Sequence, residues 1–263
     1  FCDIDAGTIY RIAPDGQPQA LYVHGSPVSG WVRLDDGSLL VVAGIERRLV
    51  AVRDGVATTF ADATDKVGWA INDLLRTPDG HCYVGGIDFN LFADPSQAGK
   101  PSPLLHVTPD GRVDIATREI VFANGMTVLP SGELLVADSL TGELLAFTRR
   151  ADGSLADRRV WAALPGEMLD GICLDADGAV WAASHHQVLR VREGGEVTDV
   201  VDMGATRATA CMLGGPEGRT LLITASDTHD RAEIRAKGPS GAVYSVRVPV
   251  AGSGLPSVYG AAP

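Results

Sequence analysis

Amide and carboxylate side chains recur at one place in a repeated unit of this sequence, and together they have the chemistry to bind a cation. The residue eight positions before a turn glycine is Asn72, Asn124 or Asp170 in three copies of the unit, and Ser29 or Ala210 in two others. Oxygen ligands that converge from separate strands suit a hard divalent cation such as Ca²⁺ or Mg²⁺, whereas Zn²⁺ favours His and Cys. A single Asn-Gly or Asp-Gly is also a good turn sequence, but three copies in register predict a set of ligands.

The repeated unit predicts the fold. Each copy has a short inner segment, a turn that ends in glycine and two apolar runs. The turn glycines lie 40 to 52 residues apart, a period typical of four-stranded propeller blades. Residues 1–12 match the second and third strands of the unit, so there are six copies and the first lacks its inner strand. The sequence therefore predicts an all-β, six-bladed β-propeller with four-stranded blades, as a single domain over residues 1–263; a Greek-key sandwich is the alternative.

Helices should be few and short, because no stretch shows sustained helical periodicity. The 31 glycines and 15 prolines indicate frequent turns. The longest insertions, residues 88–103 and 228–239, are polar and interrupted by Gly and Pro, and we interpret both as loops.

A propeller places the starts of its inner strands and the ends of its second strands at the same mouth. The second strands therefore add polar candidates, which are Asp88, Asp138, Ser139, His185, His186, Ser226 and Asp227. Histidine titrates near neutral pH and can shuttle protons. Adjacent strand residues point to opposite faces, so only one of the two histidines can line the pocket; His185 is the better placed, and a surface pair is the alternative.

Composition excludes several classes of partner. The formal net charge is -11 and no block of Lys and Arg occurs, so the basic footprint of a nucleic-acid or anionic-membrane binder is missing. No apolar run approaches the ~20 residues that span a bilayer. We expect a cytoplasmic protein with a small-molecule partner, while the start at Phe1 leaves an export signal upstream open. The widely spaced cysteines are interpreted as reduced core residues: Cys2, Cys82, Cys173 and Cys211.

Several strings in the chain resemble the regucalcin/gluconolactonase family, also called the senescence marker protein or luciferin-regenerating enzyme family. The pattern Asp-Gly-x-x-x-Asp-x-x-Gly-x-x-Trp at residues 170–181 is fairly specific to it. The likeness covers essentially the whole chain, and the other matching strings are Asn72-Asp73, Asn124-Gly125-Met126 and Asp138-Ser139.

The resemblance implies one divalent metal ion at the centre of the propeller, held by a Glu, an Asn and an Asp, with lactone hydrolysis as the usual activity. The Asn corresponds to Asn124 and the Asp to Asp170. The family's Glu belongs to a Glu-x-Pro-x-Trp string on the inner strand of the first blade, which would precede Phe1. Calcium is the expected ion, with Mg²⁺, Mn²⁺ and Zn²⁺ as alternatives.

The resemblance also implies the substrate contacts. Asn72 touches the substrate or a water on the metal, and Asp73 steadies its loop. An Arg that contacts substrate in sugar-lactone members corresponds here to Ala70. Together with Ile71 and the loop Asp88-Phe89-Asn90-Leu91-Phe92, this favours a less polar lactone or ester, with Asp88 and Asn90 as further substrate-binding candidates.

These residues predict metal-assisted hydrolysis of a lactone or related cyclic ester, in which the cation polarises the carbonyl and water attacks it. Asp170 serves as ligand and general base, His185 is the reserve base, and Asn72 and Asn124 orient metal and substrate. No Gly-x-Ser-x-Gly elbow occurs, which argues against a serine hydrolase. The alternatives are a non-catalytic propeller binding module and another propeller enzyme, akin to arylesterases or strictosidine synthases.

Overall fold

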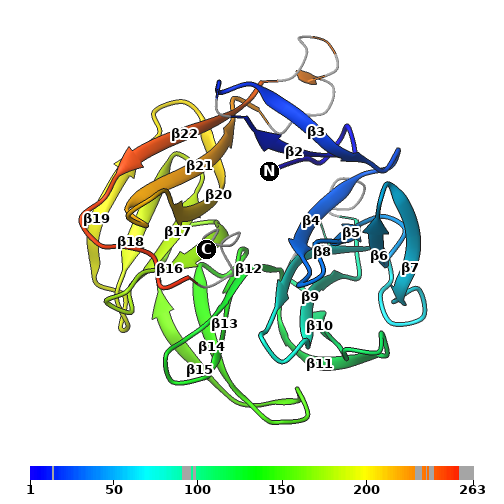
Figure 1. Cartoon of the computed structure of the whole chain (residues 1–263). Helices are drawn as coiled ribbons and strands as arrows, with labels where there is room; N and C mark the ends of the chain where they lie inside the picture. Colours follow the sequence, from blue (N-terminus) through cyan, green and yellow to red (C-terminus); the bar gives the residue numbers. More distant parts are fainter. Residues whose placement is uncertain are drawn as a thin grey trace. The chain divides into compact units, whose positions relative to one another are not determined.

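The described residues form six antiparallel sheets (Figure 1). The structure is a computed structural model, and it describes residues 1–13, 15–90, 96, 99–228, 233–234, 236 and 240–254. The chain divides into two compact units. The first comprises Phe1–Ala123 and Ala151–Ser154, and the second comprises Asn124–Arg150 and Leu155–Pro263.

The first unit contains one three-stranded and two four-stranded sheets. The three-stranded sheet has β1 (Cys2–Asp3), β2 (Thr8–Ile12) and β3 (Pro18–Val23). The next has β4 (Val28–Arg33), β5 (Leu39–Ala43), β6 (Arg48–Arg53) and β7 (Val56–Asp62). The third has β8 (Ala70–Arg76), β9 (Cys82–Ile87), β10 (Ser102–Val107) and β11 (Val113–Ile120).

The second unit contains two four-stranded sheets and one three-stranded sheet. The first has β12 (Ala123–Val128), β13 (Leu134–Asp138), β14 (Glu143–Arg149) and β15 (Leu155–Ala163). The second has β16 (Leu169–Leu174), β17 (Val180–Ser184), β18 (Gln187–Val191) and β19 (Val197–Asp202). The third has β20 (Arg207–Gly214), β21 (Thr220–Ser226) and β22 (Gly241–Arg247).

The prediction of an all-β, six-bladed β-propeller is confirmed, with three strands in the first sheet and four in each of the next four. One detail was wrong: Glu233, Ile234 and Ala236, inside a predicted loop, are helical. The single domain stays a prediction. In the part of the chain that the structure describes, no helix is long and apolar enough to cross a membrane.

Glycine turns connect each inner strand to the second strand of its blade. The five glycines that set the repeat have φ between 65° and 88°, a left-handed conformation that glycine adopts without steric cost. At Gly178 the turn is closed by the Gly178 amide, which donates to the Asp175 carbonyl at 3.1 Å. The five residues are Gly37, Gly80, Gly132, Gly178 and Gly218.

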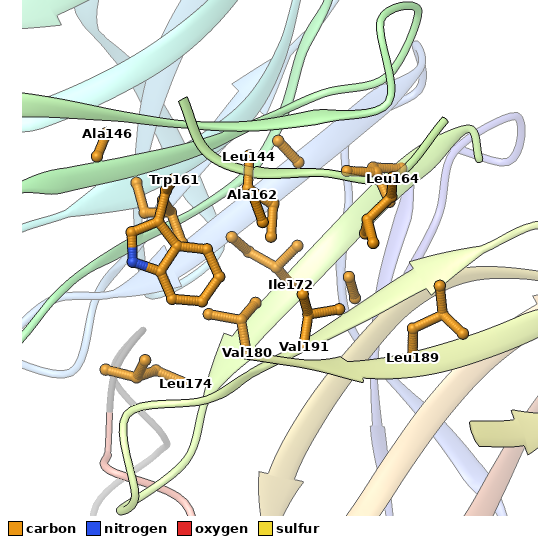
Figure 2. Packing of buried hydrophobic residues seen from close by; sticks show 14 of the residues in the cluster. Leu144, Ala146, Trp161, Ala162, Leu164, Ile172, Leu174, Val180, Leu189 and Val191 are labelled. Carbon is orange, nitrogen blue, oxygen red and sulfur yellow. The ribbon is translucent and has the colours of Figure 1, made fainter. Parts of the chain in front are cut away.

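The blades are stabilised by apolar layers between neighbouring sheets. In the second unit, Leu144 and Trp161 of the β12–β15 sheet pack with Ile172 and Val191 of the β16–β19 sheet (Figure 2). Every residue of the second strands β9, β13 and β17 is buried, as expected where a strand is covered on both faces. The apolar runs of the repeat therefore fold as blades because both faces of their middle strands are buried.

Truncation in this layer should destabilise the protein. Leu144 is 0% exposed, so Leu144→Ala leaves a cavity and should lower the free energy of unfolding by about 2–5 kcal/mol. Val160 on β15 is 45% exposed, and Val160→Ala should cost less than about 1 kcal/mol. Urea unfolding compares the two variants, and similar losses in both would contradict the packing described.

A histidine pair lies in the first unit, with His106 buried and His81 half-buried. Nδ1 of His81 and Nε2 of His106 are 2.7 Å apart, and the two rings stack with centroids 4.9 Å apart. Burial lowers the pKa of His106, and the charges of His81 and Arg112 lower it further, against the opposing effect of Asp114 and Asp152. The hydrogen bond between the rings needs one unprotonated nitrogen as acceptor. The pair is therefore stable only while it is not fully protonated.

Acid should therefore destabilise the protein through His106. Because the pKa of His106 is lower in the folded state, the unfolded state binds more protons, and stability falls as the pH drops below the ordinary value of 6.5. The free energy of unfolding should fall less between about pH 7.5 and about pH 5 in His106→Gln than in the wild type. Urea unfolding measures the difference, with His186→Gln as the exposed control. An unchanged pH dependence in His106→Gln would contradict this role.

Candidate active site

The predicted polar positions coincide with irregularities in the inner strands. The pairing of β4, β8, β16 and β20 with their neighbours shifts register once in each strand, near its start. In three strands the displaced segment contains the predicted polar residue, which is Ser29, Asn72 or Asp170. Register shifts of this kind re-aim a side chain and are common beside active sites.

In the second unit, the strands that hold Asn124 and Asp170 touch through their backbones. A Cβ added at Gly125 would lie 2.7 Å from the Asp170 carbonyl oxygen and 2.8 Å from the Gly171 Cα. Gly171 in turn is close to β20, since a Cβ there would lie 2.7 Å from the Ala210 Cα. The glycines after Asn124 and Asp170 are therefore required by the close approach of neighbouring inner strands.

Asn124 is held by a hydrogen-bonded serine. Its side chain is 8% exposed, and its Nδ2 donates to Oγ of Ser139 at 3.1 Å. The Ser139 hydroxyl donates to the carbonyl of Leu169, the residue before Asp170. Because Nδ2 faces Ser139, Oδ1 lies on the opposite side of the amide. One serine thus connects the two strands that hold the predicted ligands.

The donors at this place fit a hard cation better than a soft one. Asn124 offers an amide oxygen and the half-buried Asp170 a carboxylate, and both are ligands that Ca²⁺ accepts. Across the described ranges, no three His, Cys, Asp or Glu side chains form a group that could hold a metal ion. An ion bound here would therefore depend on amide oxygen, and the assignment of Asn124 and Asp170 as ligands stays a prediction.

His185 lies at the same end of its blade as Asp170, because Ser184 pairs with Leu169. Its φ is 43°, a left-handed conformation that is costly for a residue with a side chain. Its Nε2 is 3.1 Å from Sδ of Met168. Burial lowers the pKa of the half-buried His185, and the charges of Arg207 and His186 lower it further. The imidazole is therefore neutral near pH 7 and has the protonation state of a base.

His186 and the side chain of Glu167 lie next to His185. His186 is exposed, and its Nδ1 lies 3.2 Å from the Thr206 carbonyl oxygen; the choice of His185 over His186 stays a prediction. Glu167 accepts from Ser184 at 2.6 Å and from Gln187 at 3.0 Å, on both sides of the histidines. Sequence analysis missed Glu167, since it stands before the repeated motif and no spacing rule marks it.

The substrate-binding candidates Asn72 and Asp73 lie in the first unit, both half-buried in β8. Burial raises the pKa of Asp73 to about 6. The Asp73 carboxylate also adds to the raised pKa of Cys2, which burial brings to about 11. Asp73 therefore has a carboxyl group that changes charge near neutral pH.

Asp88 and Asn90 follow β9 in the same unit. Oδ1 of Asp88 accepts from the Gly68 amide at 2.8 Å, and Oδ2 pairs with Arg118 at 2.9 Å. Both Asp88 oxygens thus hold the chain in place, a structural role that the sequence did not indicate. Asn90 is half-buried next to the buried Phe89, whereas Leu91 and Phe92 of the predicted loop lie outside the described residues.

The cysteines agree with their interpretation as reduced residues. All four are free; Cys82, Cys173 and Cys211 are buried, and Cys2 is half-buried.

The blades and the polar residues on their inner strands place the chain among the six-bladed β-propellers. Residues 1–227 match the model of the SMP-30/Gluconolactonase/LRE-like region, and the chain belongs to this family. The resemblance found in the sequence is therefore confirmed.

Three relatives illustrate the similarity. The chain is 30% identical over 280 residues to the 6-deoxy-6-sulfogluconolactonase of Pseudomonas putida, covering 99% of this chain and 90% of that protein. It is 26% identical over 243 residues to regucalcin of Gallus gallus, covering 89% and 81%. The solved structure of a calcium-binding protein, regucalcin, from Agrobacterium tumefaciens matches with a TM-score of 0.76 at 21% identity, covering 95% of this chain and 85% of that one, which supports the fold alone.

The contact at Gly125 generates a test of the site. Gly125→Ala forces β12 away from β16, and should cost about 1–3 kcal/mol of stability and displace Asn124 from Asp170. Gly30 holds the equivalent position on β4, where an added Cβ would have neighbours no closer than 3.5 Å. Gly30→Ala should therefore be tolerated. Thermal unfolding compares the two variants, and equal stability would show that the strands do not need the close approach.

Proposed function

We propose that the chain is a metal-dependent hydrolase that opens a lactone or related cyclic ester. The observation that supports this most is the pairing of an amide and a carboxylate, Asn124 and Asp170, on two inner strands in backbone contact. Family membership supports the reaction class, since a relative 30% identical over 99% of the chain is named a lactonase. The oxygen donors of both side chains suit a hard divalent cation.

The residues that would hold the ion are Asn124, through Oδ1, and Asp170, through its carboxylate. A bound divalent cation, with Ca²⁺ first and Mg²⁺, Mn²⁺ or Zn²⁺ as alternatives, supplies a Lewis acid that polarises the ester carbonyl, an effect worth several kcal/mol of barrier. The hydrogen bond from Nδ2 to Ser139 orients the Asn124 amide.

The proton chemistry would fall to Asp170 and His185. Asp170 would be the general base that takes a proton from the attacking water and returns it to the ring oxygen released when the acyl C–O bond breaks. His185 is the reserve for this step, because its lowered pKa keeps the ring neutral near pH 7. With Nε2 directed at Sδ of Met168, Nδ1 is the nitrogen that would accept the proton. Asn72 contacts the substrate, with Asp73 beside it and Asp88 and Asn90 in the loop after β9.

The substrate should be less polar than a sugar acid lactone. Ala70 and Ile71 are 4% and 2% exposed and carry no group that hydrogen-bonds to sugar hydroxyls. Phe89, between the candidates Asp88 and Asn90, is 8% exposed. These side chains favour a substrate with apolar surface next to its ring ester.

Turnover of a lactone panel tests the proposal. The protein should hydrolyse at least one lactone, lose turnover when a chelator removes the metal, and recover when Ca²⁺, Mg²⁺, Mn²⁺ or Zn²⁺ is added singly. Asp170→Asn should lower kcat by about 100-fold or more, because it removes both a ligand charge and the base. Asp177→Asn changes an exposed turn carboxylate of the same blade and should retain turnover.

Four outcomes would contradict the proposal. Full turnover in Asp170→Asn, or turnover that a chelator does not affect, would remove the metal mechanism. Turnover of aryl esters or amines with none of lactones would instead favour another kind of propeller enzyme. A metal-free protein that hydrolyses nothing in the panel would favour a binding module.

A further inference from the structure

Ser139 is a buried side chain at the junction of the two strands that hold the candidate ligands. It is 6% exposed and follows the last residue of β13. Its hydroxyl donates to the Leu169 carbonyl, and its oxygen accepts from Nδ2 of Asn124 at 3.1 Å. It therefore contacts the side chain of Asn124 and the backbone one residue before Asp170.

The number of protons on these groups fixes the orientation of the Asn124 amide. A serine hydroxyl has one hydrogen to donate, and a carbonyl oxygen can only accept. Because the Ser139 oxygen contacts the Leu169 carbonyl, which cannot donate, the hydroxyl hydrogen points to that carbonyl, and Ser139 can then only accept from Asn124. The amide must turn its nitrogen to Ser139 and its oxygen away from it. The orientation of an amide, which is ordinarily ambiguous, is chemically determined here.

We propose that Ser139 is a positioning residue that sets the Asn124 amide with its oxygen toward the cation and fixes the start of β16 beside it. This inference rests on the proposed function for the identity of the ligands. Ser139 does not bind the ion; it acts through Asn124 and through the Leu169 carbonyl.

The proposal explains why an amide rather than a carboxylate stands at residue 124. A carboxylate has no hydrogen to donate. In Asn124→Asp, the new carboxylate oxygen and the Ser139 oxygen would therefore both be acceptors and would repel each other. Ser139 could donate to the carboxylate only by turning its hydroxyl away from Leu169. The Leu169 carbonyl would then lose a buried hydrogen bond. Asn124→Asp should therefore weaken cation binding, although a carboxylate is by charge the stronger ligand.

The first measurement needs no metal and no substrate. In ¹⁵N-labelled, metal-free protein, the side-chain NH₂ signals of Asn124 are assigned by their loss in Asn124→Ala. Ser139→Ala should shift these signals and speed their hydrogen exchange. Ser184→Ala is the matched control, because it removes another buried hydroxyl of the same unit, one that donates to Glu167 at 2.6 Å, and should leave the Asn124 signals unchanged.

The second measurement is the affinity for Mn²⁺, followed by calorimetry. Ser139→Ala should weaken binding by about 10- to 100-fold, the usual effect of losing a group that orients a metal ligand. In the Asn124→Ala background the same change should cause a smaller loss of affinity than in the wild type, because only the contact of Ser139 with the Leu169 carbonyl is left to act. Asn124→Asp should bind Mn²⁺ more weakly than the wild type, and should lose less in the Ser139→Ala background.

The outcomes separate this inference from the proposed function. Unchanged Asn124 signals in Ser139→Ala, equal losses of affinity in the wild-type and Asn124→Ala backgrounds, or tighter Mn²⁺ binding in Asn124→Asp would each overturn the role of Ser139. If the wild type binds no Mn²⁺, the metal site fails, and the NH₂ signals alone decide whether Ser139 orients the amide. If Ser139→Ala does not fold, Asn124→Asp, which retains Ser139, still decides the sign of the effect.

Discussion

The candidate site depends on the close approach of β12 and β16, which the absence of a side chain at Gly125 permits. With no Cβ at this residue, its backbone reaches within van der Waals distance of the Asp170 carbonyl and Gly171. The Ser139 hydrogen bonds then hold the same two strands together on their polar side. An amide and a carboxylate thereby come to stand on adjacent, rigid strands, an arrangement that preorganises a site better than a loop would.

The blades make this arrangement possible by keeping the polar residues at strand starts. Apolar layers such as that around Leu144 and Trp161 bury the middle strands completely, which leaves little room for motion of the inner strands (Figure 2). The register shift of β16 between Leu169 and Ile172 displaces Asp170 from the regular pairing. The candidate site therefore coincides with a local irregularity within a well-packed sheet.

The blades and the candidate ligands could be predicted from the sequence, because the residue patterns that indicate them lie within short stretches of the chain. The turn glycines need positive φ, and their spacing gave the blades; Asn124 and Asp170 followed from counting back from two of them. Ser139 and Glu167 act through contacts to residues 30 and 20 positions away in the chain, which no single-sequence pattern reveals. The sequence indicated Asp88 as a substrate-binding candidate, but its ion pair with Arg118 is seen only in the structure.

The most direct test of the central claim is an anomalous difference map from a crystal of the protein soaked in Mn²⁺. We expect a peak within about 2.0–2.6 Å of both Oδ1 of Asn124 and the carboxylate of Asp170. A map with no peak at these two atoms, or with the nitrogen of Asn124 facing the ion, would contradict it.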